Sequence, residues 1–282
     1  MTQSPALPAH ILFATDLGAR SDRAQDRAIR LARDWNAKLT VVHALDTLDA
    51  PNDQPSRPTA EGARSRAFSL LREQFDKDVE VVVEEGKPGD VVLQAAEARP
   101  VDLIVTGIAG NDPIAQSIFG SATSKLVRKA AAPVLVVKKR GLEPYRRIVV
   151  ATDLSAASAA SLRLALRLFD PSAITLFHVY EAPFSRFLEE RDLYEQKLKP
   201  GALDDVRRFA VEAAGEAVAD QLHVEVVTGD AAVRIADYAA QMDTDLVVAG
   251  TQGRSGIVGV LMGSVALALL DEVPCDVMVV PA

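Results

Sequence analysis

Two segments of the chain have glycines at a spacing that suits phosphate binding. Residues 107–121 (GIAGNDPIAQSIFGS) and residues 250–264 (GTQGRSGIVGVLMGS) each begin with a glycine, have a second glycine three positions later, and end in a Gly-Ser pair. In both segments the Gly-Ser pair stands just before a predicted helix. Main-chain N–H groups at a helix start, with the helix dipole behind them, form an anion site. Both segments are therefore predicted to hold a phosphate largely through main-chain amides, with the serine hydroxyl as a further donor.

The first two glycines of each segment have different expected tasks. Gly107 and Gly250 would let a ligand approach the backbone, and Gly110 and Gly253 would allow a turn with positive φ. Both segments follow a short apolar run, so they begin at the carboxyl end of a predicted strand, where open parallel sheets bind ligands. A tight strand-to-helix connection that is merely rich in glycine is the alternative interpretation.

An acidic side chain follows the first apolar run of each half of the chain, in the sequences Ala14-Thr15-Asp16 and Ala151-Thr152-Asp153. A carboxylate repels phosphates, but it accepts hydrogen bonds from ribose hydroxyls or from an adenine amino group. A phosphate loop and a sugar-facing acid together describe a nucleotide site. As an alternative, the two aspartates simply cap the helices that follow them.

These residues recur because the sequence consists of two similar halves. The second half repeats the first at an offset of about 140 residues, which is enough for a separate domain core. The matching runs are 11–17 with 148–154, 38–44 with 173–179, 101–107 with 244–250, and 134–137 with 277–280. The charged segment 138–147 (KKRGLEPYRR) separates the halves. We therefore expect two domains, residues 1–140 and 145–282.

The elements that must position the glycines and aspartates alternate between strands and helices. The predicted strands are short continuous apolar runs, a pattern typical of parallel strands covered on both faces. Between the first two of them, Ala24, Ala28, Leu31 and Trp35 form one apolar stripe on a helix. Strands that alternate with such helices predict an α/β fold with an open, doubly wound parallel sheet in each half. Residues 46–60 are expected to form a loop, and residues 182–201 to be more helical.

Composition excludes several classes of partner. A net charge of −8 argues against nucleic acid or an anionic membrane as the main partner. The longest run of low charge, residues 256–270, is shorter than the roughly 20 residues that cross a bilayer. The single cysteine, Cys275, and an N-terminus without a signal pattern favour the cytoplasm. No zinc constellation is expected, and neither a GxxxxGK[ST] loop nor a Ser-His-Asp arrangement is present, so at most slow hydrolysis of bound nucleotide is expected.

The chain resembles a tandem member of the universal stress protein family over nearly its whole length. In that family the spacing Gly-x2-Gly-x9-Gly-Ser/Thr, together with an aspartate that ends the first strand, marks the members that bind ATP. Both halves of this sequence meet that pattern. The resemblance implies Rossmann-like (flavodoxin-like) domains with five strands in the order 3-2-1-4-5, and an adenine near Ala44 and Val179. It also implies that strands 134–137 and 277–280 pair with each other about a pseudo-twofold axis, while a further homodimer is left open.

The two nucleotide sites are not expected to be equal. The second segment has Arg254 directly after its second glycine, as is usual in the family, although Gln252 stands where a histidine is common. The first segment has Asn111-Asp112-Pro113 instead, and an aspartate there would repel a triphosphate. Lys125, one turn into the following helix, is expected to compensate. We expect ATP, with Mg²⁺ as an optional companion ion, in both halves, with the second site the stronger.

The sequence thus predicts an ATP-binding stress-response protein that regulates or adapts an unknown protein partner. A nucleotide-free interaction module and a slow ATPase are the alternatives. The predicted nucleotide-binding residues are Ala14, Thr15, Asp16, Ala44, Gly107, Gly110, Gly120, Ser121 and Ala122 in the first half, and Ala151, Thr152, Asp153, Val179, Gly250, Gly253, Arg254, Gly263, Ser264 and Val265 in the second.

Overall fold

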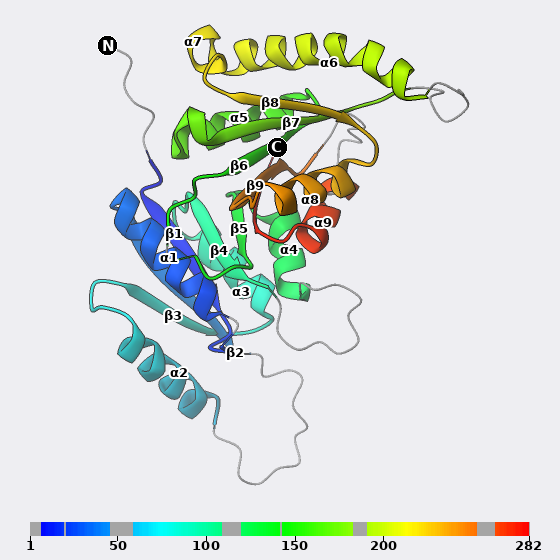
Figure 1. Ribbon diagram of the computed structural model, residues 1–282. Coiled ribbons are helices and arrows are strands. Elements are labelled where there is room, and N and C mark those ends of the chain that lie inside the picture. The colour runs from blue at the N-terminus through cyan, green and yellow to red at the C-terminus, as the bar shows by residue number, and fades with distance from the viewer. Residues whose placement is uncertain are drawn as a thin grey trace. The chain divides into compact units, whose positions relative to one another are not determined.

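The computed structural model describes residues 7–19, 21–45, 59–108, 120–141, 143–182, 191–252 and 263–281. The chain divides into an N-terminal unit, residues 6–142, and a C-terminal unit that includes residues 143–282. Each unit is an α/β domain with a parallel sheet, as predicted (Figure 1). The exact domain limits, 1–140 and 145–282, and the pairing of strands between the halves stay predictions.

The N-terminal unit builds its sheet in the strand order β3-β2-β1-β4-β5. Its described strands are β1 (His10–Thr15), β2 (Lys38–Leu45), β3 (Glu80–Glu85), β4 (Leu103–Gly107) and β5 (Val134–Val137). Its described helices are α1 (Asp22–Trp35), α2 (Ala60–Gln74), α3 (Pro88–Glu97) and α4 (Ser121–Lys129).

The C-terminal unit repeats this order as β8-β7-β6-β9-β10. Its described strands are β6 (Ile148–Thr152), β7 (Ile174–Tyr180), β8 (His223–Thr228), β9 (Leu246–Gly250) and β10 (Asp276–Val280). Its described helices are α5 (Ala156–Leu168), the 3-10 helix η1 (Pro171–Ala173), α6 (Arg191–Ala214), α7 (Glu216–Ala219), α8 (Ala231–Gln241) and α9 (Ser264–Glu272).

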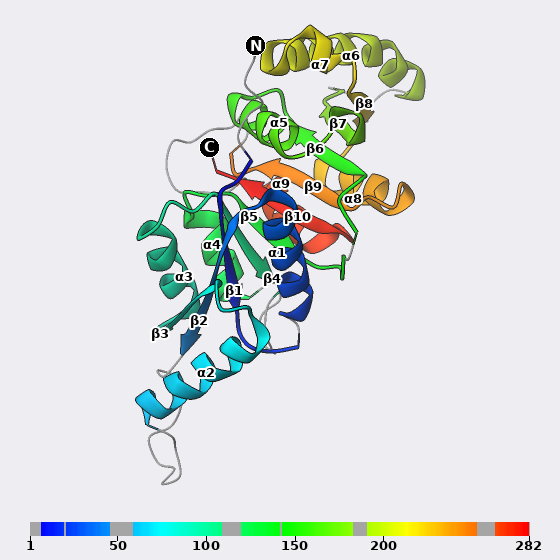
Figure 2. The same ribbon diagram turned by 90° about the vertical axis from the view of Figure 1, so that its left-hand side faces the viewer.

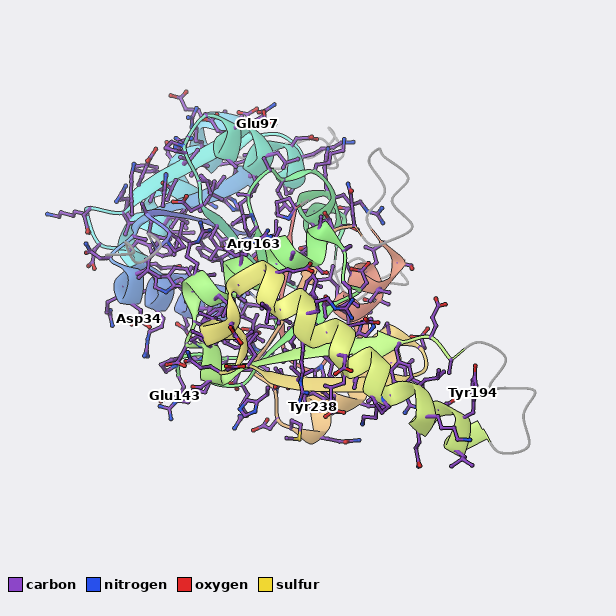
Figure 3. The ribbon with its side chains drawn as sticks, turned by 90° about the horizontal axis from the view of Figure 1, so that it is seen from above. Asp34, Glu97, Glu143, Arg163, Tyr194 and Tyr238 are labelled. Atoms are coloured by element: carbon purple, nitrogen blue, oxygen red, sulfur yellow. The ribbon has the colours of Figure 1, made fainter. Side chains whose placement is uncertain are left out.

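Right-handed crossovers fix which helices share a face of each sheet. The chain moves from β1 outward to β3 and then returns to β4, so α1 and α2 cover one face and α3 packs beside α4 on the other (Figure 2). In the C-terminal unit α8 packs beside α9, and α5 packs beside α6. There Arg163 on α5 donates from Nε to the carbonyl oxygen of Ala213 on α6 at 3.2 Å (Figure 3). The strand order therefore reverses between β1 and β4, and again between β6 and β9.

The continuous apolar strands are buried, because helices cover both of their faces. Ile11, Leu12 and Phe13 are consecutive in β1, and each is 0% exposed. On α1, Ala24, Ala28 and Leu31 are buried as the apolar stripe predicts, while Trp35 at the end of the helix is half-buried. The predicted loop of residues 46–60 lies almost wholly outside the described residues. Of residues 182–201, which the sequence predicts to be more helical, residues 191–201 form the start of α6.

Candidate functional site

In each unit the carboxyl ends of two neighbouring strands bring together an aspartate and a glycine of the predicted site. In the N-terminal unit β1 pairs with β4, so Asp16, directly after β1, lies next to the end of β4 at Gly107. In the C-terminal unit β6 pairs with β9 in the same direction, so Asp153 and Gly250 follow at the same edge of the sheet. The strand order reverses between these pairs, and a crevice at such a point is where open α/β sheets bind their ligands.

The turn after the first strand has the same strained geometry in both units. The Oγ1 atoms of Thr15 and Thr152 accept hydrogen bonds from the backbone N–H groups of Leu17 and Leu154, both at 3.0 Å. The two leucines have φ values of 58° and 65°. A branched residue at positive φ costs about 1–3 kcal/mol, and such strain is found most often at functional sites. The recurrence of both features in the two units indicates a turn that is kept for its shape.

A histidine on the second strand fixes the same turn from the side. Nδ1 of His43 donates to the carbonyl oxygen of Thr15 at 2.9 Å, and Nδ1 of His178 donates to that of Thr152 at 2.7 Å. His43 is half-buried and His178 is buried, so they lie at the rim and in the core of their units. Ala44 and Val179, the residues expected near an adenine, follow these histidines directly and are half-buried.

Neither aspartate is the N-cap of the helix that follows it, so the simple capping interpretation is wrong. The N-caps of α1 and α5 are Ser21 and Ser155. Oδ1 of Asp16 accepts hydrogen bonds from the N–H of Gly18 at 2.8 Å and from the hydroxyl of Ser21. Oδ1 of Asp153 accepts from the N–H of Ser155 at 3.1 Å. In both units, then, one carboxylate oxygen holds the turn at the carboxyl edge of the sheet.

The helices that follow the glycine segments begin without a side-chain cap. Gly120 is the N-cap of α4 and Gly263 the N-cap of α9, and no side-chain hydrogen bond caps either helix. Ser121 and Ser264 at the first helical positions are exposed. The first-turn amides of a helix need outside partners, and the positive end of the dipole attracts an anion. Next in the chain, Ala122 is half-buried and Val265 is 39% exposed.

Gly250 has a packing reason to lack a side chain. An added Cβ would lie 3.3 Å from Oγ of Ser161 and 3.4 Å from the carbonyl oxygen of Ala157, both on α5. Close approach of helix and strand therefore accounts for this glycine without a ligand. Gly107 is the corresponding residue of the N-terminal unit and is buried at the end of β4. Its carbonyl oxygen accepts a hydrogen bond from the Thr123 hydroxyl at 3.3 Å. The predicted residues Gly110, Gly253 and Arg254, and the segment Asn111-Asp112-Pro113, lie outside the described residues.

Lys125, which the sequence suggested as a compensating charge for Asp112, forms an ion pair with another helix. Its Nζ forms an ion pair with Oδ1 of Asp90 on α3, and the hydrogen bond from Lys125 lowers the pKa of the Asp90 carboxyl. The pair joins the two helices on one face of the sheet. Asp112 lies outside the described residues, so its compensation by Lys125 stays a prediction, and the ammonium group already has an acidic neighbour in Asp90.

Comparison with known proteins identifies the family. The sequence model of the universal stress protein family matches residues 9–138 and again residues 144–281. The chain belongs to the universal stress protein family. It holds two family domains in tandem, as the internal repeat and the two α/β units require.

Individual universal stress proteins agree with this assignment. A Staphylococcus aureus (strain USA300) protein named for the family is 30% identical over 152 residues, which is 51% of this chain and 92% of that protein. Two solved structures share the fold of both domains. A Pseudomonas aeruginosa UCBPP-PA14 protein named for the family has a TM-score of 0.64 at 20% identity and covers 98% of this chain and 94% of its own. A universal stress protein of Archaeoglobus fulgidus DSM 4304 has a TM-score of 0.66 at 16% identity, with coverage of 97% and 98%.

The described part of this universal stress protein shows neither a metal cluster nor a membrane span. Among its described residues, no group of three or more His, Cys, Asp or Glu side chains is arranged to hold a metal ion. Of the described helices, none is both long enough and apolar enough to span a bilayer.

Proposed function

We propose that this universal stress protein binds ATP at the carboxyl edge of both sheets and acts as a nucleotide-dependent regulator or adaptor of a protein partner in the cytoplasm. The observation that carries the proposal is the duplicated edge. In each unit a strained Thr-Asp-Leu turn lies beside a strand that leads to a helix with a glycine N-cap and no side-chain cap. The strained geometry, present in both units, supports the proposal because such strain is found most often at functional sites.

The geometry gives each part of ATP a natural partner. The uncapped starts of α4 and α9 offer main-chain amides to the phosphates. Asp16 and Asp153 are acceptors for the ribose hydroxyls. Ala44 and Val179 present small or branched apolar surface, which suits the flat face of an adenine. Mg²⁺ would accompany the phosphates when it is present, since hard cations bind oxygen ligands.

The two sites are proposed to differ in strength. Arg254 comes directly after Gly253, the second glycine of the C-terminal segment. In the N-terminal segment Asp112 stands two residues after the second glycine, Gly110. A guanidinium attracts a triphosphate, and a carboxylate repels it. Because Lys125 is paired with Asp90 on α3, it offers less compensation than its position in the sequence suggests. The C-terminal site is therefore proposed to bind ATP more tightly.

Isothermal titration of ATP into Gly263→Val and Gly120→Val variants tests the proposal. Gly263 has φ −60° and ψ 143°, which valine adopts, and an added Cβ would meet nothing nearer than the Thr251 carbonyl oxygen at 3.5 Å. The backbone of Gly120, at φ −72° and ψ 173°, is equally permissive. Each valine should cover the helix-start amides and reduce the stoichiometry from two to one.

Unchanged stoichiometry in both variants would defeat the proposed site. A Gly201→Ala variant is the control, because a Cβ at Gly201 on α6 meets nothing within 4 Å. If ATP neither binds nor raises the unfolding midpoint of the wild type, the protein is instead a nucleotide-free interaction module, since any ligand that binds only the native state raises that midpoint. Release of phosphate above a Gly263→Val background would indicate a slow ATPase.

A further inference from the structure

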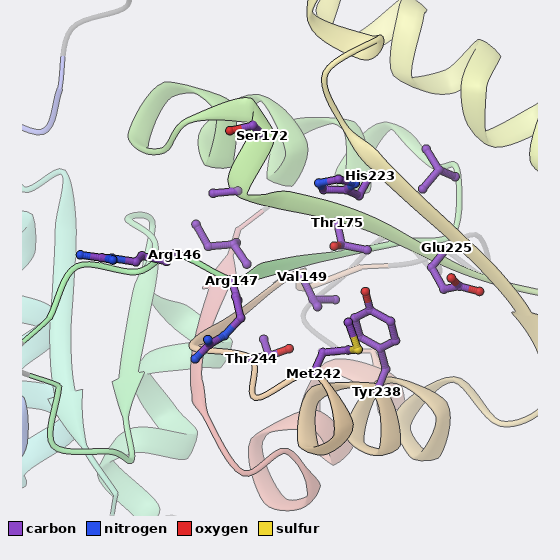
Figure 4. A pocket seen from close by; sticks show the side chains of 13 residues that line it. Arg146, Arg147, Val149, Ser172, Thr175, His223, Glu225, Tyr238, Met242 and Thr244 are labelled. Atoms are coloured by element: carbon purple, nitrogen blue, oxygen red, sulfur yellow. The ribbon is translucent and has the colours of Figure 1, made fainter.

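A cavity of about 400 Å³ lies in the C-terminal unit at the amino ends of β6, β7 and β8. The proposed nucleotide site is at the carboxyl ends of the strands, so this cavity lies at the opposite edge of the same sheet. Its walls come from the start of the three strands and from the end of α8 (Figure 4). A volume of this size lies within the range of small-molecule pockets, roughly 300–1,000 Å³.

One row of side chains on the sheet forms the floor of the cavity. Val149, Thr175 and His223 are register partners across β6, β7 and β8, so they point to the same face. Two residues further along β7, Phe177 faces the ring of Tyr238 on α8, with ring centroids 5.0 Å apart. The row of Val149 therefore also faces α8. Figure 4 shows Tyr238 and Met242 rising from the helix end toward these strands.

The N-terminal unit has a network of charged side chains at the corresponding positions. There the same row is Leu12, Thr40 and Glu80. Nη2 of Arg99, which lies just beyond the end of α3, donates to Oε1 of Glu80 at 2.7 Å, and Nζ of Lys38 donates to Oε2 at 2.7 Å. These two cations lower the pKa of Glu80 to about 2, Arg99 contributing most. Oγ1 of Thr40 is also hydrogen-bonded to Nε2 of His10 at 2.8 Å.

Only the threonine of this network remains in the C-terminal unit. Strand register and the internal repeat place Thr175 at the position of Thr40, and His223 at that of Glu80. The repeat also places Met242 at the position of Arg99, Ala173 at that of Lys38 and Arg147 at that of His10. Arg147 turns to the aspartates beside it, with ion pairs of 2.8 Å to Asp243 and 3.3 Å to Asp245. The network that closes this edge in one unit is thus replaced in the other, where the space is open.

The charges around the cavity are largely balanced. Arg147 has its two aspartate partners, and Glu225 forms an ion pair with Lys199 at 3.9 Å. Figure 4 shows the Arg146 guanidinium extending away from the space between α8 and the strands. An ionised ligand would gain little from such a site, because Arg147 and Glu225 already have counter-charges and the Arg146 guanidinium points away.

The remaining walls suit a flat, uncharged molecule. Tyr238 offers an aromatic ring, Met242 a thioether that packs well on rings, and Val149 an aliphatic surface. The hydroxyl of Thr175, the hydroxyl of Thr244 (1% exposed) and the ring nitrogens of His223 offer hydrogen-bond donors and acceptors. We propose that this cavity is a second ligand site, which binds a neutral aromatic or heteroaromatic molecule that carries one or two hydrogen-bonding groups.

Amide chemical-shift titration with 2-naphthol and indole tests the proposal, with 2-naphthoate as the charged match of the naphthol. Both neutral probes should give saturable shifts at Thr175, His223, Tyr238 and Thr244, and the naphthoate should bind at least fivefold more weakly. Saturating ATP should leave the affinity for 2-naphthol unchanged, because the two sites lie at opposite edges of the sheet. Shifts confined to residues 151–154, or competition by ATP, would overturn the second site.

A variant that restores the side chains of the N-terminal unit supplies the sharper test. Met242→Arg combined with His223→Glu should close the cavity as Arg99 and Glu80 do, and should weaken 2-naphthol binding at least tenfold. Thr175→Val keeps the volume but removes the floor hydroxyl, so it should weaken 2-naphthol binding at least threefold. It serves as the test if the double variant fails to fold. Unchanged affinity in either folded variant, or no saturable shift in the wild type, would overturn the proposal.

Discussion

The hydroxyl of Tyr145 donates a 2.7 Å hydrogen bond to Oδ2 of Asp276, and both side chains are buried, Asp276 completely. Tyr145 lies near the start of the C-terminal unit, and Asp276 is the first residue of β10. The ring of Tyr145 also meets Phe169 edge to face, with centroids 5.9 Å apart. The hydrogen bond and the ring contact therefore both hold Tyr145 to its own unit.

Replacement of Tyr145 by phenylalanine should destabilise the C-terminal unit. The ring contact remains, but a buried carboxylate loses a donor, and hydrogen bonds to charged groups contribute about 1.5–3 kcal/mol. The denaturant midpoint, followed by amide signals of β9 and β10, measures the effect. Phe169→Leu removes the ring contact and keeps the hydrogen bond. A Tyr145→Phe loss below about 0.5 kcal/mol, the scale of a neutral surface substitution, would contradict the importance of this bond.

Acid should remove stability from the N-terminal unit through Glu80. Its pKa in the folded protein is about 2, lowered chiefly by Arg99, so its contribution is present above the ordinary glutamate pKa of 4.5. That contribution is lost as the pH falls from about 4.5 toward 2. Glu80 is 32% exposed, so the contribution should be at most about 1 kcal/mol after solvent screening.

Arg99→Met, which installs the residue of the other unit, should raise the pKa of Glu80 and flatten this pH dependence. Unfolding midpoints between pH 2 and pH 6, together with an NMR titration of Glu80, measure both effects. Lys38→Met should act in the same direction but less, since Lys38 is the smaller cause. A Glu80 pKa that stays near 2 in the Arg99 variant would contradict this assignment.

Two glycines should respond oppositely to alanine. A Cβ at Gly141, near the end of the N-terminal unit, would lie 1.5 Å from Nη2 of Arg27. Arg27 is buried, with 4% of its surface exposed. Gly141→Ala should therefore displace a buried arginine and destabilise the unit by about 1–3 kcal/mol. Gly201→Ala lies in α6 with nothing within 4 Å and should stabilise it by about 0.5–1 kcal/mol. Thermal unfolding of both variants checks the signs, and a stable Gly141→Ala protein would show that Arg27 moves at little cost.

The threonine that supports the strained turn should affect nucleotide binding. Oγ1 of Thr152 accepts from the N–H of Leu154 at 3.0 Å and shares a 2.9 Å hydrogen bond with Ser158. Thr152→Val keeps the shape, but it leaves Leu154 at positive φ without this support, so Asp153 should lose its position. We expect about a tenfold weaker ATP affinity at the C-terminal site, equivalent to about 1.4 kcal/mol. Titration with ATP measures it, and Thr175→Val at the opposite edge of the sheet should change nothing there.

Much of the fold could be predicted because its signals are local and occur twice. The continuous apolar runs match buried parallel strands, and the stripe of Ala24, Ala28 and Leu31 matches the buried face of α1. The repeat located Asp16 and Asp153 at corresponding strand ends. The sequence alone therefore predicted the helices, the strands and the edge of each sheet at which the candidate site lies.

The contacts between side chains were less predictable, because they depend on distances through space. The repeated Thr-Asp-Leu triplet was visible, but nothing in it indicates positive φ at Leu17 and Leu154. The pairing of Lys125 with Asp90 needs the contact between α3 and α4. The open amino edge of the C-terminal sheet appears only when Met242 is placed opposite Thr175 and compared with Arg99.

Native mass spectrometry of the purified chain with saturating ATP tests the central claim most directly, since it reports identity and stoichiometry together. We predict a mass increase of two ATP molecules per chain, with the C-terminal site filled first. The increase should fall to one in Gly263→Val and to none when Gly120→Val is added. A wild-type chain that stays without adenine nucleotide at millimolar ATP, or one that keeps two after both substitutions, would contradict the account.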